Sequence, residues 1–139
     1  MKQKMIPTKG VIKPEPKREM PMVLSKKEYV NNGLFILQND YYRKILFHDI
    51  LWLEASGSYC YLNLKEDKRI IVVHPLAELE KTLPKDIFTR IHRSFMVNIF
   101  AVDAFIGNTL CIGKTRLYVS NSFRKSIFSH FHILGRKKD

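Results

Sequence analysis

Short runs of alternating apolar and polar residues fill most of the chain after residue 33, and this period of two predicts β-strands. The clearest predicted hairpin joins residues 59–64 to residues 70–73 through a charged turn. Within "DILWLEA", strict alternation places Ile50, Trp52 and Glu54 on one face and Leu51, Leu53 and Ala55 on the other. Further short strands are predicted at 34–37, 42–47, 88–91, 95–99, 101–106, 109–112 and 115–119.

Two segments break this pattern and predict helices. Pro75 suits the first position of a short amphipathic helix over residues 75–83, whose apolar residues recur at helical spacing before Pro84. A second helix is predicted over residues 122–134, with an apolar stripe formed by Phe123, Ile127, Phe131 and Leu134. The predicted fold is therefore mainly β, a compact domain of short antiparallel strands in small sheets with these two helices.

The composition divides the 139 residues into one domain with tails. Residues 1–32 mix prolines with Lys and Glu, which predicts a flexible basic arm. The domain is expected at 33–135, and residues 136–139 form a basic tail.

The formal net charge of +11 is distributed unevenly. Residues 45–87 carry five Lys and Arg against seven Asp and Glu, whereas residues 88–139 carry nine against two. A positive charge of this size favours nucleic acid, an anionic membrane surface or an acidic protein as partner. The concentration of positive charge in the later strands and loops favours a polyanion as the binding partner.

The remaining composition argues against several other classes of protein. Cys60 and Cys111 lack the spacing of a zinc site or a disulfide framework, and His130 and His132 would point apart on a helix. No apolar run approaches the roughly 20 residues needed to cross a bilayer. We therefore expect a cytoplasmic protein with no cofactor, no metal and no membrane partner.

Cationic residues interrupt apolar segments at six positions: Arg90, His92, Arg93, Arg116, Arg124 and Lys125. Arg124 and Lys125 are predicted in the first turn of the final helix, where a cation opposes the helix dipole at a cost of about 0.3–1 kcal/mol. Main-chain N–H groups at a helix start also favour phosphate, so we interpret these two residues as part of an anion site.

The segment "FTRIHRSFMVN", residues 88–98, contains the most informative break. We interpret it as two strands joined by a corner, with His92, Arg93 and Ser94 projecting outward from that corner. Ile91, Phe95, Val97, Trp52 and Leu53 are assigned to the core.

Four blocks, "DILWLEASGSYCYLNL", "PLAELEKTLP", "FTRIHRSFMVN" and "RLYVSNSFRKSI", resemble the LytTR family in order and spacing. These are DNA-binding domains of bacterial response regulators, and the resemblance covers roughly residues 34–134. It implies loops that enter successive major grooves of double-stranded DNA, commonly as two copies on repeated sites. The contacts that the resemblance implies include Ser58, Tyr59, Cys60, His92, Arg93, Ser94, Asn121, Ser122, Arg124 and Lys125. On their charge alone, Lys114 and Arg116 are added as candidates to contact phosphates.

The expected function is therefore sequence-specific DNA binding by a non-enzymatic transcriptional regulator. Arg93 is the candidate for reading base edges, and the other cations would position the protein on phosphates. The arm is too short for a receiver domain, so we expect a stand-alone binder, a homodimer on DNA, or a separate sensor or receiver partner.

Two alternatives from other classes stay open. One is an RNA- or ribosome-associated basic β-domain, in which Tyr59, Tyr61 and Tyr118 would stack on bases. The other is an enzyme that uses His92 and Ser94.

Overall fold

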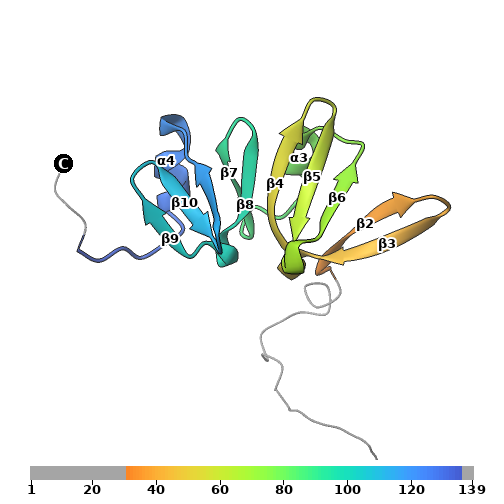
Figure 1. Ribbon diagram of the computed structural model, residues 1–139, viewed down its shortest axis with the longest axis horizontal. Coiled ribbons are helices and arrows are strands. Elements are labelled where there is room, and N and C mark those ends of the chain that lie inside the picture. Colours follow the sequence, from red (N-terminus) through yellow and green to blue (C-terminus); the bar gives the residue numbers. More distant parts are fainter. Residues whose placement is uncertain (1–30, 136–139) are drawn as a thin grey trace, which may run out of the picture. The chain divides into compact units, whose positions relative to one another are not determined.

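The computed structural model describes residues 31–135, so the predicted tail and all but the last two residues of the predicted arm lie outside the described residues. Three antiparallel sheets and two α-helices make up the described part (Figure 1). The strands of the two-stranded hairpin are β2 (Gly33–Gln38) and β3 (Tyr41–Leu46). In spatial order, the five-stranded sheet contains β6 (Arg69–Val72), β5 (Tyr59–Leu64), β4 (Ile50–Ser56), β8 (Phe95–Asn98) and β7 (Phe88–His92). The three-stranded sheet contains β11 (Thr115–Tyr118), β10 (Thr109–Ile112) and β9 (Ala104–Ile106).

Short helical elements connect these strands. The α-helix α3 (Leu76–Thr82) follows β6, and α4 (Asn121–Phe128) follows β11. Single 3-10 turns occur at η1 (Phe47–Asp49), η2 (Lys65–Asp67) and η3 (Ile99–Ala101). The mainly β fold with small antiparallel sheets and two helices is therefore confirmed. Pro75 lies one residue before α3 as its N-cap and not inside it.

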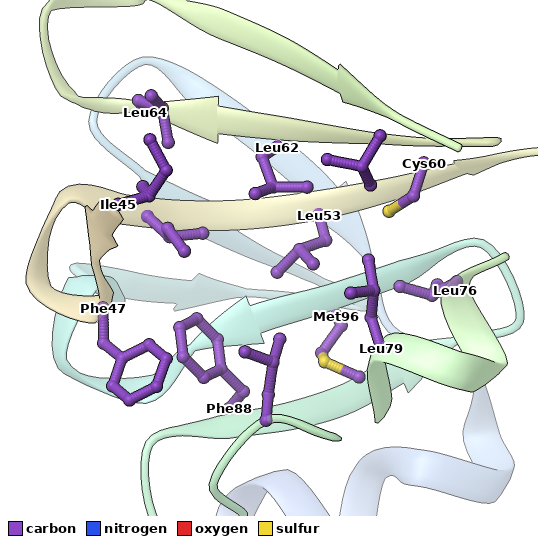
Figure 2. Packing of buried hydrophobic residues seen from close by; sticks show 13 residues of the cluster. Ile45, Phe47, Leu53, Cys60, Leu62, Leu64, Leu76, Leu79, Phe88 and Met96 are labelled. Carbon is purple, nitrogen blue, oxygen red and sulfur yellow. The ribbon is translucent and has the colours of Figure 1, made fainter. Parts of the chain in front are cut away.

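The five-stranded sheet is buried on both faces at β4, β8 and β7, and on one face at β5 and β6. Neighbouring residues of β8 show this, because Met96 belongs to one buried cluster and Val97 to the other. The first cluster packs the sheet against α3 and β3, and Figure 2 shows Leu76 and Leu79 of α3 facing it. The second cluster joins the other face to the three-stranded sheet and to Ile127 of α4. Alternating side chains of one strand thus serve two cores.

A β-bulge in β4 overturns the strict alternation predicted for this strand. The register with β5 shifts between Ile50 and Trp52, so two residues of β4 occupy the space of one. Ile50 and Leu53 consequently lie in the same cluster, and both are fully buried, while Leu51 and Trp52 pack against the other cluster.

The final helix ends six residues earlier than predicted. After Phe128 the N–H groups of His130 and Phe131 bond to carbonyls three residues back, at 3.2 and 3.1 Å, which tightens the chain into turns. Phe131 still packs on Phe105, with ring centroids 5.8 Å apart, but Leu134 is 96% exposed. The predicted stripe is therefore wrong at Leu134, because the helix needed to carry it to the core has ended.

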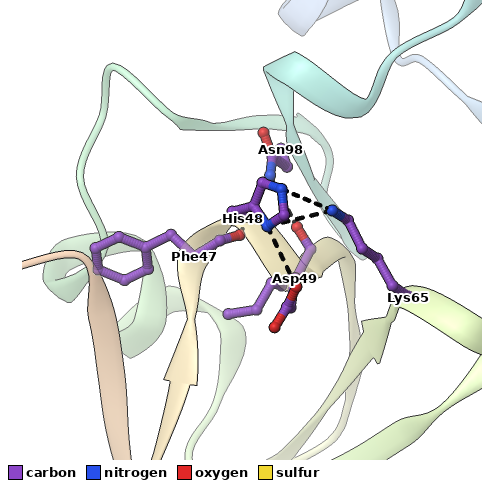
Figure 3. Close-up of polar contacts among 6 residues, drawn as sticks. Phe47, His48, Asp49, Lys65 and Asn98 are labelled. Carbon is purple, nitrogen blue, oxygen red and sulfur yellow. Dashed lines mark hydrogen bonds and ion pairs between the residues drawn. The ribbon is translucent and has the colours of Figure 1, made fainter. Parts of the chain in front are cut away.

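Asn98 at the end of β8 is the one buried polar residue among those described. Its Nδ2 donates to the carbonyl of Phe47 at 3.3 Å and to that of Ile50 at 2.9 Å, while its Oδ1 accepts from the N–H of Phe100 at 2.9 Å. Figure 3 shows the side chain beside the η1 turn. Asn98 therefore ties β8 to the start of β4, and the last residue of "FTRIHRSFMVN" has a structural role.

We expect Asn98→Ala to lower the free energy of unfolding by about 1–3 kcal/mol, because it leaves buried carbonyl groups without donors. Urea denaturation measures this change. Asn63→Ala is the control, since the half-buried Asn63 makes a single long bond of 3.5 Å to the Trp52 carbonyl. Equal losses in the two variants would contradict the role assigned to Asn98.

Candidate nucleic-acid interface

The turn between β7 and β8 consists of Arg93 and Ser94, because His92 pairs with Phe95 across it. Beneath this turn the Arg90 guanidinium donates to the carbonyl of His92 at 2.9 Å and to that of Arg93. Its third contact is an ion pair with Glu80 of α3. Arg90 is thus a brace that fixes the turn from below, and it leaves the side chain of Arg93 exposed to solvent.

His92 and Ser94 are half-buried and do not project freely, which corrects the prediction that all three corner residues point outward. The imidazole packs on Phe95 and Tyr118, with centroids 5.2 and 5.9 Å away. Its Nδ1 accepts from the Ser94 N–H at 3.0 Å, so the neutral ring carries its proton on Nε2. This contact uses the backbone of Ser94, and no bond among the described residues joins the imidazole to the Ser94 hydroxyl, as a nucleophile would need.

The turn between β4 and β5 lies next to the Arg93 turn. It consists of Gly57 and Ser58, because Ser56 pairs with Tyr59, and a φ of +63° at Gly57 favours glycine there. The Ala55 N–H donates to the Ser94 carbonyl at 2.8 Å and joins the two turns. Ser58 and the half-exposed Tyr59 are therefore held at the same end of the sheet as Arg93 (Figure 1).

The start of α4 is attached to the same region. The Ser120 N–H donates to the Ile91 carbonyl at 2.9 Å, so α4 begins beside the end of β7. Ser120 is the N-cap, although its side chain makes no capping bond, and Asn121 and Ser122 are exposed in the first turn.

Arg124 and Lys125 are the fourth and fifth residues of α4, one position later in the helix than predicted, because α4 begins at Asn121. Lys125 belongs to the last turn of this short helix, where a cation complements the dipole, so the predicted dipole penalty is wrong for this residue. The Arg124 guanidinium lies over the Phe128 ring, 5.1 Å from its centroid. Arg124 is therefore half-buried against its own helix, while Lys125 is exposed.

Lys114 and Arg116 are not part of this cluster of turns. Lys114 lies in the tight turn between β10 and β11, at the end opposite to Tyr118, because Thr109 pairs with Tyr118 and Ile112 with Thr115. It lines a cavity with Glu66 and Asp67 of η2. Arg116 is exposed partway along β11.

Cys60 is fully buried, and its exclusion from solvent removes it from the candidate contacts. Figure 2 shows its sulfur pointing into the first cluster. Burial raises the pKa of its thiol to about 11. The side chain of Cys60 is part of the core, whereas that of the preceding residue of β5, Tyr59, remains accessible.

Six residues thus form one exposed surface, which we call the loop edge: Ser58, Tyr59, Arg93, Asn121, Ser122 and Lys125. Three segments far apart in sequence supply it, and backbone hydrogen bonds connect them. None of the ion pairs among the described residues involves Arg93 or Lys125. Their charges are consequently available to an anion.

Other chemistries find no support in residues 31–135. No group of three or more His, Cys, Asp and Glu there is placed to hold a metal ion. No helix in that range has the length and apolar character of a membrane span. A small basic β-domain with unpaired cations on rigid turns is typical of nucleic-acid binding proteins.

Comparison with known families places the chain within this class. Residues 40–132 match the model of the LytTr DNA-binding domain family, so the chain belongs to the LytTR family. A similar solved structure is the LytTr DNA-binding domain of a methyl-accepting/DNA response regulator from Bacillus cereus. It is 28% identical with a TM-score of 0.59, and the match covers 71% of this chain and 95% of that one. No curated protein sequence matches the chain.

Sequence reasoning missed the roles of two residues. Arg90 was grouped with the polyanion-binding cations, yet it is bound to two carbonyls and to Glu80. Tyr118 was considered for stacking on RNA bases, yet its ring contacts His92. A half-buried arginine beside a helical glutamate leaves no signal in one sequence, because the contact depends on how α3 packs.

We expect Arg90→Lys to loosen the Arg93 turn, because an ammonium cannot bond both carbonyls and Glu80 in a planar fork. Amide hydrogen exchange at Ala55 and Ser94 should become faster. Arg69→Lys is the control, since Arg69 also pairs with a glutamate, Glu54 at 3.2 Å, but does not contact the turn. Unchanged exchange at both amides in Arg90→Lys would refute the brace.

We expect one thiol of the native protein to react with a disulfide reagent at pH 8 and two after unfolding. The half-buried Cys111 should react, whereas Cys60 has a pKa of about 11 and is fully buried, so its thiolate is scarce and shielded. The native Cys111→Ser variant should therefore lack a fast thiol, and a fast reaction in it would contradict the burial of Cys60.

Proposed function

We propose that the chain is a sequence-specific double-stranded DNA-binding transcriptional regulator that places its loop edge in the major groove. Membership of the LytTR family supports DNA binding. The observation that carries the finer proposal is the set of backbone bonds that hold two exposed turns and the start of α4 together at one end of the domain.

The turns suit a duplex because they combine rigidity with exposed donors. Base readout needs side chains held in fixed positions, since a flexible side chain gives weak discrimination. Arg93 extends from a turn that Arg90 braces, and a guanidinium can bond bidentately to guanine O6 and N7. Arg93 is therefore proposed to contact base edges.

The remaining polar residues of the loop edge would position the domain. Lys125, and Arg124 beside it, would contact phosphates, while Ser58, Asn121 and Ser122 offer hydrogen bonds to phosphates or bases. His92 would contribute through its Nε2–H, because its Nδ1 is occupied by Ser94. Lys114 and Arg116, which lie away from the loop edge, would add only long-range attraction.

Binding of single-stranded RNA is the competing function and depends on exposed aromatic rings. Tyr61 does not offer a free face, because the Arg69 guanidinium lies 3.8 Å from its centroid. Tyr59 and Tyr118 are about half exposed, and Tyr118 also contacts His92. Duplex DNA is favoured because the chain belongs to a family of DNA-binding domains.

Selection of bound duplexes from a random pool tests the proposal. The wild-type protein should select a defined sequence, and Arg93→Ala should lose preference at about one base pair, a loss of roughly 1–3 kcal/mol. Arg69→Ala is the matched control, because Arg69 is an exposed arginine on β6, outside the loop edge. Uniform weakening in Arg93→Ala would make Arg93 a phosphate contact, and a preference for single-stranded RNA over the duplex would refute the proposal.

The salt dependence of DNA affinity distinguishes residues that contact phosphates, such as Lys125, from Arg93, which is proposed to contact base edges. Lys125→Ala should weaken binding at every sequence and reduce the slope of log K against log salt by about 1. Lys81→Ala, an exposed lysine of α3 away from the loop edge, should leave that slope unchanged. An unchanged slope in Lys125→Ala would remove Lys125 from the interface.

A further inference from the structure

A groove with a volume of about 510 Å³ lies between the β2–β3 hairpin, β6 and α3, away from the loop edge. Its walls include the consecutive residues 34–38 of β2 and the consecutive residues 71–74, which are the last two residues of β6 and the two that follow it. Successive side chains of a strand point to opposite faces, so one face of a strand would contribute only every second residue to a wall. A wall that contains every residue in turn is therefore formed by the edge of the strand. The groove is therefore bounded by two strand edges.

Within residues 31–135, both of these edges lack a neighbouring strand. β6 is the outermost strand of the five-stranded sheet, and β2 pairs with β3 alone (Figure 1). Free strand edges with unpaired N–H and C=O groups are sites at which another chain adds. Neither edge is covered by any part of the chain that the structure describes.

The side chains around the groove form an exposed apolar patch. Five of them are more than half exposed: Phe35, Leu37, Tyr42, Ile71 and Val73. At roughly 100 Å² for each such side chain they present about 500 Å², in the upper part of the range for the largest patch of an ordinary monomer. A standard protein interface buries about 800 Å² per partner. The apolar patch together with a rim of surrounding polar residues would reach this area.

We propose that this surface joins two copies of the chain, with the β2–β3 hairpin of one copy packed against β6 and α3 of the other. The proposal is independent of how the loop edge contacts DNA. A two-fold contact requires a self-complementary surface, and this patch combines a projecting hairpin with a receiving groove.

The charges around the groove favour a second copy over an unrelated apolar peptide. The hairpin carries Arg43 and Lys44, both exposed, and neither takes part in an ion pair among the described residues. The carboxylate that lines the groove belongs to Glu78 of α3. Packing the hairpin of one copy on α3 of the other brings these opposite charges together twice across the two-fold axis.

The loop edge remains free in such a dimer, because none of its residues lines the groove. A dimer would therefore present two loop edges. In combination with the proposed function, this provides two DNA-reading surfaces for repeated sites, and it does so before DNA is bound.

Sedimentation of the full chain without DNA tests the proposal. The wild-type chain should associate to a dimer, and Leu37→Lys or Val73→Lys should weaken this association by roughly tenfold or more. Phe100→Lys is the matched control, because Phe100 is 79% exposed on η3 and does not line the groove. All variants should keep the wild-type circular dichroism, and at concentrations where every chain is monomeric they should keep the wild-type melting temperature, since each replaced side chain is mostly exposed.

A mixing experiment identifies the contact itself. The ion pair proposed between Arg43 of one hairpin and Glu78 of the other copy's α3 allows a charge swap, because Arg43 does not line the groove itself. When Arg43→Glu and Glu78→Lys chains are mixed, one of the two symmetric contacts places the new carboxylate beside the new ammonium and the other keeps the wild-type pair, whereas each variant alone places like charges together at both contacts. The mixed dimer should therefore form more tightly than either variant alone, which native mass spectrometry of chains with different masses resolves.

Three results would overturn the proposal: a wild-type chain that stays monomeric at high micromolar concentration, a dimer insensitive to both Leu37→Lys and Val73→Lys, or no preference for the mixed dimer. Each can occur while the wild-type chain still selects a DNA sequence. Conversely, a dimer with no duplex binding would overturn the proposed function alone.

Discussion

The pairing of β4 with β8 is the contact on which the rest of the domain depends. It joins strands separated by the β5–β6 hairpin, α3 and β7, through partners such as Leu53 with Met96 and Trp52 with Val97. Because adjacent residues of β8 face different cores, this one ladder connects both hydrophobic clusters. The bonds of Asn98 extend it at one end, and the bond from Ala55 to Ser94 extends it at the other. Because β4 and β8 are paired, the turn before Tyr59 and the turn that contains Arg93 are neighbours.

Some charged residues of the domain form ion pairs within the fold, and others are free to contact a ligand. Acidic residues of the first half pair within the fold, as Glu54 does with Arg69 and Glu80 with Arg90. Cations of the second half, such as Arg93 and Lys125, have no such partner among the described residues. A duplex would therefore meet positive charge on rigid turns, and binding would not have to break existing ion pairs. Arg90 links the two roles, since its pair with Glu80 fixes the turn that presents Arg93.

Sequence patterns predicted the strands and helices well, but they predicted less well which side chains are buried and which are exposed. The hairpin over 59–73, the meander over 104–118 and the helix near Leu79 depend on local periodicity and turn residues, and all are confirmed. The alternation of β4 was wrong because a bulge near Ile50 adds one residue. The prediction that Leu134 packs on the core was wrong because the helix ends at Phe128. The prediction that Cys60 contacts DNA was wrong because the register of β5 points its side chain inward. Bulges, helix ends and register depend on neighbours across the sheet, which no local window contains.

The sequence by itself determined the fold class, the family and the region that carries the positive charge, because strand period, turn residues and the "FTRIHRSFMVN" block are local properties of the chain. Tertiary structure decided which cations are free. It placed Arg93 in solvent, Arg90 under the turn and Lys114 at the far end of its hairpin. It also left the edges of β2 and β6 unpaired beside an apolar groove. The physical reason is that exposure and pairing are relations between distant segments, fixed only when sheets and helices pack.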